Sequence, residues 1–134
     1  MHSMNTVVQP STVAAPAAKY ALAMTVPANS SLLLTSGIVG ERPDGSISDD
    51  IGSQALEMWK TIDHLLIAAG FTKGDVVAYT TYVVVGHDFS SVMAARDRYF
   101  EDHRATSTLV PVPMLARPQW LVEVTVTAAK SAAS

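Results

Sequence analysis

The sequence predicts an α+β domain in which one mixed sheet of five to six strands carries two helices on one face. Two segments repeat apolar residues at three- and four-residue steps, which is typical of amphipathic helices. The segments around them are short, rich in Val and Thr, and alternate in polarity, which indicates strands. The order of elements is β-β-α-β-α-β-β. Because two helices cannot cover both faces of so wide a sheet, we expect both on one face, with the other face free to meet something else.

The first half of the chain is predicted to begin with two strands and a turn. Lys19–Val26 alternates loosely and ends at Pro27, as a strand does. Leu32–Leu34 predicts a short buried strand. Arg42–Gly45 is a turn sequence, since its proline presets φ and its glycine accepts a positive φ.

Both helices have recognisable boundaries. The first is predicted over Asp49–Ala69, with Ser48, Asp49 and Asp50 supplying a cap and negative charge at its start and Gly70 ending it in a left-handed conformation. The second is predicted over Phe89–Phe100, with Asp88 as its N-cap. The predicted inner face of the first helix comprises Ile51, Ala55, Leu56, Trp59, Ile62, Leu65, Leu66 and Ala69.

The second half contains three strands. Val76–Val85 is apolar on both faces and is therefore predicted as a central strand. Thr106–Met114 carries two prolines, which favours an edge strand or a strand that lines a pocket over a central one. Gln119–Ala128 alternates, so that three valines (Val122, Val124 and Val126) share one face and Glu123 lies on the other. If the valines pack under the helices, Glu123 points to the uncovered face.

The length of 134 residues suits one domain. We expect this domain at residues 16–129, with flexible tails at 1–15 and 130–134, and Met4 is a candidate for the natural start. Charged residues make up 16% and hydrophobic residues 49% of the chain. Such a low charge indicates either apolar surface buried between subunits or an Ala- and Val-rich monomer.

Several classes of function are disfavoured. The net charge is −3 and no run of Lys or Arg occurs, so we expect no nucleic-acid partner. No apolar stretch is long enough to span a membrane and no signal peptide is recognisable, so a cytoplasmic location is expected. With no cysteine and four scattered histidines, no metal site is predicted. A phosphate-binding glycine loop is also lacking.

Eight segments, in order and spacing, resemble the Rid family, also known as YjgF or L-PSP, over nearly all of Ala15–Ala128. They are Ala17–Ala21, Leu34–Gly37, Arg42–Ile47, Ala68–Gly70, Gly74–Val77, Asp88–Val92, Tyr99–Arg104 and Leu121–Val124. The resemblance implies a chorismate-mutase-like (YjgF-like) fold and a homotrimer with small-molecule pockets between subunits. It also implies hydrolysis of enamines and imines to ketoacids and ammonia, with neither a metal nor an organic cofactor.

The family's functional residues match this chain only in part. Tyr20 matches a tyrosine of the pocket, Ser36 and Gly37 match its Ser-Gly turn, and Glu123 matches a last-strand glutamate that helps hold or activate water. The asparagine common on the second helix is replaced by Met93.

The strand arginine that binds the substrate's carboxylate in the family is not matched. Counting forward from Arg104, its position falls on Ser107, and counting back from Glu123 it falls on Thr108. Arg96 and Arg117 are the candidates to replace its charge, although surface positions are favoured for Arg96, Arg104 and Arg117 alike. Losing a bidentate Arg–carboxylate pair would weaken binding of an imino acid strongly.

Two hypotheses follow. In the first, Glu123 activates water for a neutral or more apolar enamine or imine, in a pocket that includes Met93, Leu109, Met114 and Trp120. In the second, the chain is a non-catalytic trimer that binds a small ligand or a protein, and Glu123 is held by structural hydrogen bonds. Ribonuclease activity, suggested by an old family label, is disfavoured by the acidic charge balance.

Overall fold

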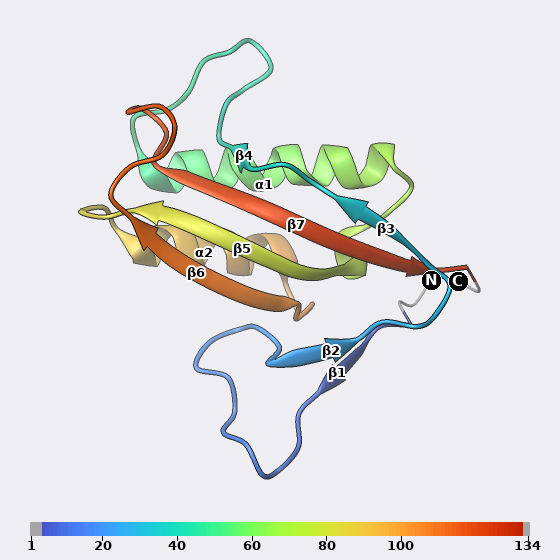
Figure 1. The fold of residues 1–134 in the computed structure, drawn as a ribbon. Coiled ribbons are helices and arrows are strands. Elements are labelled where there is room, and N and C mark those ends of the chain that lie inside the picture. Colours follow the sequence, from blue (N-terminus) through green and yellow to red (C-terminus); the bar gives the residue numbers. More distant parts are fainter. Residues whose placement is uncertain (1–3, 133–134) are drawn as a thin grey trace.

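The computed structural model describes residues 4–132, and a five-stranded mixed sheet with two helices on one face forms its centre (Figure 1). The sheet has the order β3-β7-β5-β6, and the short β4 also pairs with β7. Its strands are β3 (Ser30–Leu34), β4 (Ile38–Val39), β5 (Val76–Val84), β6 (Thr106–Val112) and β7 (Val122–Ser131). The helices are α1 (Ile51–Ala68) and α2 (Phe89–Phe100), and a single 3₁₀ turn, η1 (Lys73–Asp75), precedes β5.

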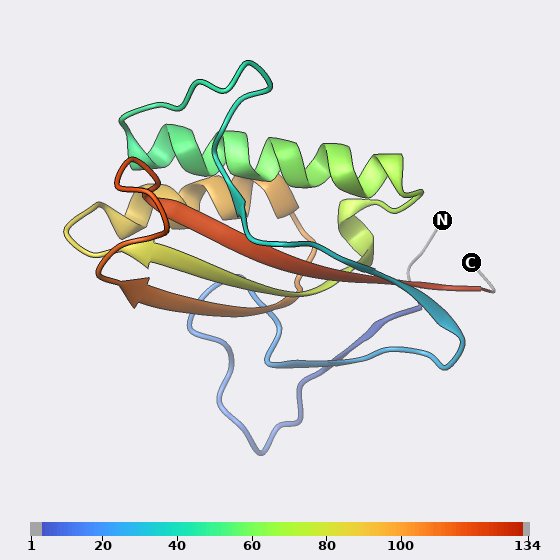
Figure 2. The same ribbon diagram turned by 45° about the horizontal axis from the view of Figure 1, so that its top comes forward.

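The predicted fold class is confirmed. β5 and β6 are parallel and joined through α2, whereas β7 runs antiparallel to both β3 and β5. Figure 2 shows α1 and α2 on the same side of the sheet. The strand with two nearby prolines, β6, lies at an edge, as predicted, while β5 and β7 are interior. Within residues 4–132, neither helix is long and apolar enough to cross a membrane.

Side-chain alternation on β7 sorts its residues as the sequence predicted. Val122, Val124 and Val126 are at most 2% exposed and pack under the helices. Burying each of them contributes about 1.5–3 kcal/mol. Glu123 and Thr125, between them, are half-buried on the other face. The helices therefore determine which face of β7 carries the carboxylate.

Four aromatic rings join the helices to the sheet. Trp59 of α1 stacks on Tyr99 of α2, with ring centroids 5.2 Å apart, and meets Tyr79 of β5 edge-on at 5.3 Å. Phe100 packs against all three rings. The Tyr99 hydroxyl donates a hydrogen bond to Asp63 Oδ1 (2.7 Å), and burial together with this carboxylate raises the pKa of Tyr99.

The prediction of the inner face of α1 was wrong at three positions. Leu56 and Leu65 are 45% and 39% exposed, and Ala69 lies after the helix and is exposed. Gln54 and Met58 are fully buried instead. A stripe drawn from apolar residues alone misses a polar residue whose hydrogen bonds are all made inside the protein.

The expected buried strand at Leu32–Leu34 exists as part of β3, but most of it is not buried. Leu32 and Leu34 are 59% and 70% exposed, and only Leu33 packs against the core. The reason is the two-residue period of a strand, which turns alternate leucines away from the helices.

The N-terminal region contains a hairpin that the sequence did not predict. β1 (Thr6–Val8) lies in the stretch assigned to a tail and pairs with β2 (Ala23–Thr25), which is shorter than the predicted first strand. In Figures 1 and 2 the hairpin stands apart from the helices. It joins the sheet through Ala21, whose N–H donates to Ala105 O (2.9 Å). At the other end, β7 continues to Ser131, beyond its predicted end.

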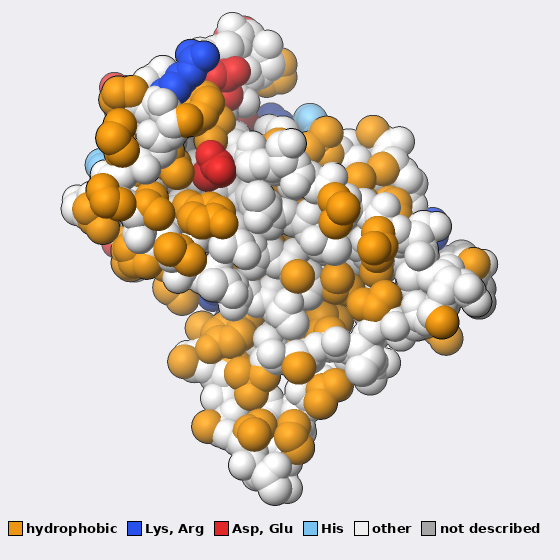
Figure 3. Space-filling model, viewed as in Figure 1, with side chains coloured by type: hydrophobic (Ala, Val, Ile, Leu, Met, Phe, Trp, Pro, Cys, Tyr) orange, Lys and Arg blue, Asp and Glu red, His pale blue; other side chains and the backbone are white. Residues whose placement is uncertain are grey.

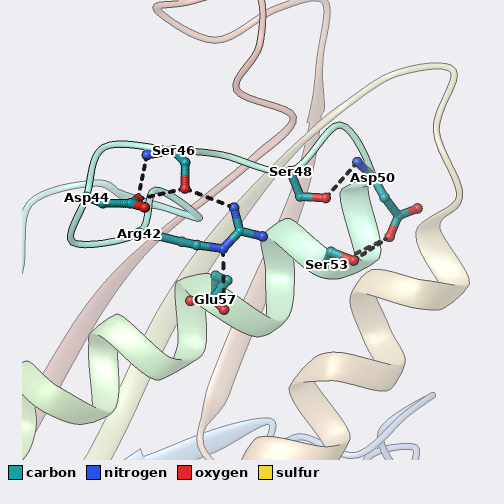
Figure 4. A network of polar contacts seen from close by, with 7 residues as sticks. All are labelled: Arg42, Asp44, Ser46, Ser48, Asp50, Ser53 and Glu57. Atoms are coloured by element: carbon teal, nitrogen blue, oxygen red, sulfur yellow. Dashed lines mark hydrogen bonds and ion pairs between the residues drawn. The ribbon is translucent and has the colours of Figure 1, made fainter.

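A polar network shapes the connection between β4 and α1 (Figure 4). Asp44 accepts hydrogen bonds from the Ser46 N–H (2.9 Å) and hydroxyl (2.7 Å), which closes the predicted turn. Arg42 donates to the Ser46 hydroxyl (3.2 Å) and lies 3.9 Å from Glu57 of α1. Asp50 caps the helix by accepting a hydrogen bond from a first-turn N–H at 2.8 Å, as predicted.

Gln54 ties this connection to the segment that leads into β7. Its Nε2 donates to Ser48 O (2.7 Å) and to Gln119 O (2.9 Å), and its Oε1 accepts from the Leu121 N–H (2.9 Å). The side chain is fully buried. Its amide is satisfied by the backbone of the segment before α1 and of the segment before β7. Gln54 thereby anchors the backbone two residues before Glu123.

We expect Gln54→Leu to lower the free energy of unfolding by about 2 kcal/mol, because three part-buried backbone groups lose their partner. Urea denaturation measures the change. Gln119→Leu is the matched control, since Gln119 takes part only through its backbone carbonyl. Equal stability of the two variants would contradict the anchoring role of Gln54.

Candidate functional site

The candidate residues fall into two groups on opposite faces of the sheet. Glu123 pairs in register with Tyr82, and both lie on the face away from the helices, which we call the open face. Ser107 pairs with Tyr79, which is buried under the helices. A strand turns successive residues to opposite faces, so Glu123 and Ser107 of one chain do not face each other.

The first group consists of Ser36, Gly37 and Glu123. The Thr35 N–H donates to Val126 O, and the Thr35 hydroxyl accepts from the Val126 N–H, both at 3.0 Å. These two hydrogen bonds fix the β3–β4 connection to β7 and bring the Ser-Gly turn beside the Glu123 carboxylate. A Cβ atom on Gly37 would lie 2.6 Å from Glu123 Cδ. Glycine is therefore needed here for space.

The Glu123 carboxylate makes no hydrogen bond and no ion pair with any other residue in the range 4–132. Glu123 is half-buried and pairs in register with Val39 of β4 on one side and with Tyr82 of β5 on the other. A carboxylate without a structural partner can accept hydrogen bonds from a water and take its proton. Structural hydrogen bonds, as the non-catalytic hypothesis expected for Glu123, do not exist within this part of the chain.

A groove of about 490 Å³ lies between the β3–β4 connection and the C-terminal half of α1, and Glu123 is not among its lining residues. Ser36 lies on its wall, and most of the lining is apolar, including Leu34, Ile38 and Leu65. Its size is in the range of small-molecule sites. The turn next to Glu123 therefore borders a space with room for a small metabolite.

We expect Gly37→Ala to displace the Glu123 carboxylate while changing the free energy of unfolding by less than about 1 kcal/mol, since the end of a flexible side chain can move aside. A crystal structure of the variant and a denaturation curve test both parts. Gly74→Ala is the control, because its added Cβ would make only an ordinary contact, 3.6 Å from the Thr72 hydroxyl. An unmoved carboxylate in Gly37→Ala would refute the prediction.

The second group surrounds a small cavity between β6 and α2, which we call the β6–α2 cavity. Its walls are formed mainly by Trp59, Thr81, Met93, Arg96, Ser107 and Leu109. The room inside is about 10 Å³, roughly enough for one water-sized group. Three predicted site residues, Met93, Ser107 and Leu109, thus meet here, and the structure adds Arg96.

Arg96 is buried, with a side chain 9% exposed, so its predicted surface position was wrong. Its Nε donates to Asp97 Oδ1 (3.0 Å). Nη2 lies equally close to that oxygen but has no acceptor in hydrogen-bond geometry. Burial raises the pKa of the neighbouring Tyr79, against hydrogen bonding from Ser107 and the positive charge of Arg96. The sequence signal was its position four residues after Val92 on the buried stripe of α2.

Tyr20 and Thr108 join neither group within one chain. Tyr20 is half-buried beside the start of β6, where the next residue bridges to Thr106. Glu123 lies level with Val110, four residues or about 13 Å further along that strand. Thr108 pairs with Thr80 and is exposed on the open face. Of the two positions considered for the family's arginine, only Ser107 lines the cavity.

The remaining predicted residues lie in the loop between β6 and β7. Met114 is 62% exposed. Arg117 is exposed and sits over the ring of Trp120, 5.3 Å from its centroid, as a cation–π pair. Arg117 therefore has a surface position, as favoured from the sequence, and lies outside the cavity. No group of His, Asp and Glu suited to a metal ion occurs within residues 4–132.

Residues 11–130 match the family model described as endoribonuclease L-PSP. The chain belongs to the Rid/YjgF/L-PSP family. It is 32% identical over 77 residues to the 2-iminobutanoate/2-iminopropanoate deaminase of Salmonella typhimurium, covering 57% of this chain and 60% of that protein. The deaminase of the same name from Escherichia coli is 32% identical over 76 residues, covering 56% of this chain and 59% of that protein. The Rid-family chain thus spans about three fifths of these relatives' length.

Solved structures of the Rid family share the fold. YyfB from Yersinia pestis has a TM-score of 0.83 at 26% identity, over 92% of this chain and 97% of that one. YjgF from Escherichia coli has a TM-score of 0.67 at 24% identity, over 82% of this chain and 92% of that one. At this identity the likeness shows a shared fold and nothing more. The resemblance stated from the sequence is confirmed for family and fold.

Proposed function

We propose that this Rid-family chain hydrolyses a small imine or enamine, with Glu123 holding and activating the attacking water. The observation that carries the proposal is the Glu123 carboxylate on the open face, which has no partner among residues 4–132 and lies against Gly37 of the Ser-Gly turn. The relatives at 32% identity are imine deaminases, which supports the same reaction class.

The reaction needs only water and proton transfers. Glu123 takes a proton from the water as the oxygen adds to the carbon of the C=N bond, giving a tetrahedral carbinolamine. The carboxylic acid returns that proton to the nitrogen, which completes the neutral carbinolamine. Glu123 then takes the proton of the carbinolamine hydroxyl and passes it to the nitrogen as the C–N bond breaks, so that a carbonyl compound and ammonia are released. An enamine first tautomerises to the imine. Such general acid–base assistance is worth roughly 10²–10⁴ in rate.

The site is proposed to be shared between copies of the chain. Glu123 and the β6–α2 cavity lie on opposite faces of one sheet, so a second copy must bring its cavity edge to the open face of the first. The open side of the molecule suits such contact, because Figure 3 shows hydrophobic side chains spread over it and few charged ones. The homotrimer implied by the family resemblance supplies this arrangement.

The chain is not proposed to be a typical 2-iminobutanoate deaminase. Strand β6 reads TSTLVPV and contains no arginine, and Ser107 offers a neutral hydroxyl at the cavity. The second candidate function, a non-catalytic trimer that binds a small ligand or a protein, is favoured by the groove of about 490 Å³ beside Ser36, because Glu123 is not among its lining residues. Neither function requires a metal, a nucleic acid or a membrane.

We expect the native chain to release ammonia from freshly generated 2-aminoacrylate or 2-iminobutanoate more slowly than its deaminase relatives do, and Glu123→Gln to slow this release a further hundredfold, roughly, or more. Glutamine keeps the shape but cannot accept the proton. The control is Glu41→Gln, which changes an exposed glutamate elsewhere.

Full activity in Glu123→Gln would overturn the proposed role of this carboxylate. A native chain that binds the matching carbonyl compound but hydrolyses neither substrate would favour the non-catalytic function. Sedimentation of the native chain measures the assembly, and a monomer that remains fully active would exclude a shared site.

A further inference from the structure

Two buried N–H groups at the β6–α2 cavity have no acceptor in hydrogen-bond geometry among residues 4–132, although one of them, on Arg96, lies 3.0 Å from Asp97 Oδ1 in an ion pair. They are Nη2 of Arg96 and Nε1 of Trp59, and both side chains line the cavity. The Arg96 side chain is 9% exposed, and Trp59 is 2% exposed. Buried donors are nearly always satisfied in folded proteins, so two of them at one small cavity point to a ligand with acceptor oxygens.

Neither donor is free to turn away. Trp59 lies between its stacking partner Tyr99 and two rings that meet it edge-on, those of Tyr79 and Phe100. Arg96 is held at Nε by Asp97. The donors are therefore already oriented, which reduces the entropy lost when a ligand binds.

The charge of the cavity favours an anion. Arg96 is the only charged residue among those that line it, and the hydroxyls of Ser107 and Thr81 can add further donors. Asp97 forms an ion pair with the Arg96 guanidinium but does not line the cavity, and its side chain is 31% exposed. Room for one water-sized group accommodates a carboxylate oxygen at the mouth but not a whole metabolite.

We propose that Arg96 binds the carboxylate of the substrate, so that α2 supplies the positive charge that strand β6 lacks. This inference rests on the proposed function and names its substrate class: imines that bear a carboxylate, rather than the neutral or apolar imines expected from the sequence. Trp59 and Ser107 add neutral hydrogen bonds to the same group. The guanidinium enters the cavity from the helix wall, opposite the strand wall on which Ser107 lies.

Binding of stable analogues tests the inference without turnover. The probes are 2-oxobutanoate, in which C=O replaces C=NH, and its neutral counterpart 2-oxobutanamide. Isothermal titration gives both dissociation constants for the full-length chain, and the Arg96 Nε and Trp59 Nε1 signals in ¹H–¹⁵N NMR spectra report the place of binding. We expect the native chain to bind the carboxylate roughly ten- to a hundredfold more tightly than the amide.

Three variants separate the charge from other effects. Arg96→Gln should bind the two probes equally. Asp97→Asn should bind 2-oxobutanoate several-fold more tightly than the native chain, because the competing carboxylate is gone. Arg98→Gln, on the exposed side of the same helix, is the matched control and should leave the preference unchanged.

The proposal is overturned if the native chain shows no preference for the carboxylate, or binds neither probe, or if folded Arg96→Gln keeps the preference. Should Arg96→Gln fail to fold, Arg96→Lys and Asp97→Asn decide: unchanged carboxylate affinity in both would overturn it. Glu123→Gln distinguishes this inference from the proposed function. If it abolishes hydrolysis and leaves 2-oxobutanoate affinity intact, both stand, and failure of hydrolysis in the native chain with carboxylate binding intact refutes the proposed function alone.

Discussion

The structure depends on one constraint: both helices cover the same face of a five-stranded sheet. Burial under α1 and α2 accounts for Val122, Val124 and Val126, and the pleat then turns Glu123 to the open face. The same constraint turns Ser107 of β6 toward α2. A one-residue shift in the register of either strand would exchange these faces, so the hydrophobic pattern that forms the core also positions the chemistry.

The sequence could predict features that follow from periodicity. The bounds of α2 match their prediction, and the face of Glu123 follows from alternation along β7. It could not predict β1, because three residues carry no period and pair with a segment far along the chain. The position of the family's arginine could not be fixed either, because counting from Arg104 gives Ser107 and counting from Glu123 gives Thr108. Neighbouring residues of a strand point to opposite faces of the sheet, so the two positions differ in their surroundings. In the structure, Ser107 lines the β6–α2 cavity and Thr108 is exposed on the other face.

Arg96 was missed for a different reason. Charged residues are rarely buried, so a helical arginine is assigned to the surface unless a partner is known. Its burial becomes understandable only when α2, β5 and β6 are placed together, with Asp97 at Nε and Tyr79 nearby. Trp59 is similar: its place in the core was predicted, but an indole N–H without an acceptor is visible only in three dimensions.

The separation of the two charged groups also has an electrostatic consequence. On opposite faces, the Glu123 carboxylate cannot pair with the Arg96 guanidinium, whose ion-pair partner is Asp97 at 3.0 Å. In the proposed shared site, Glu123 and Arg96 of one chain therefore do not neutralise each other by direct contact. The same geometry couples positions 96 and 107: with about 10 Å³ of room, a guanidinium entering from α2 requires a small residue on β6, and serine satisfies this condition.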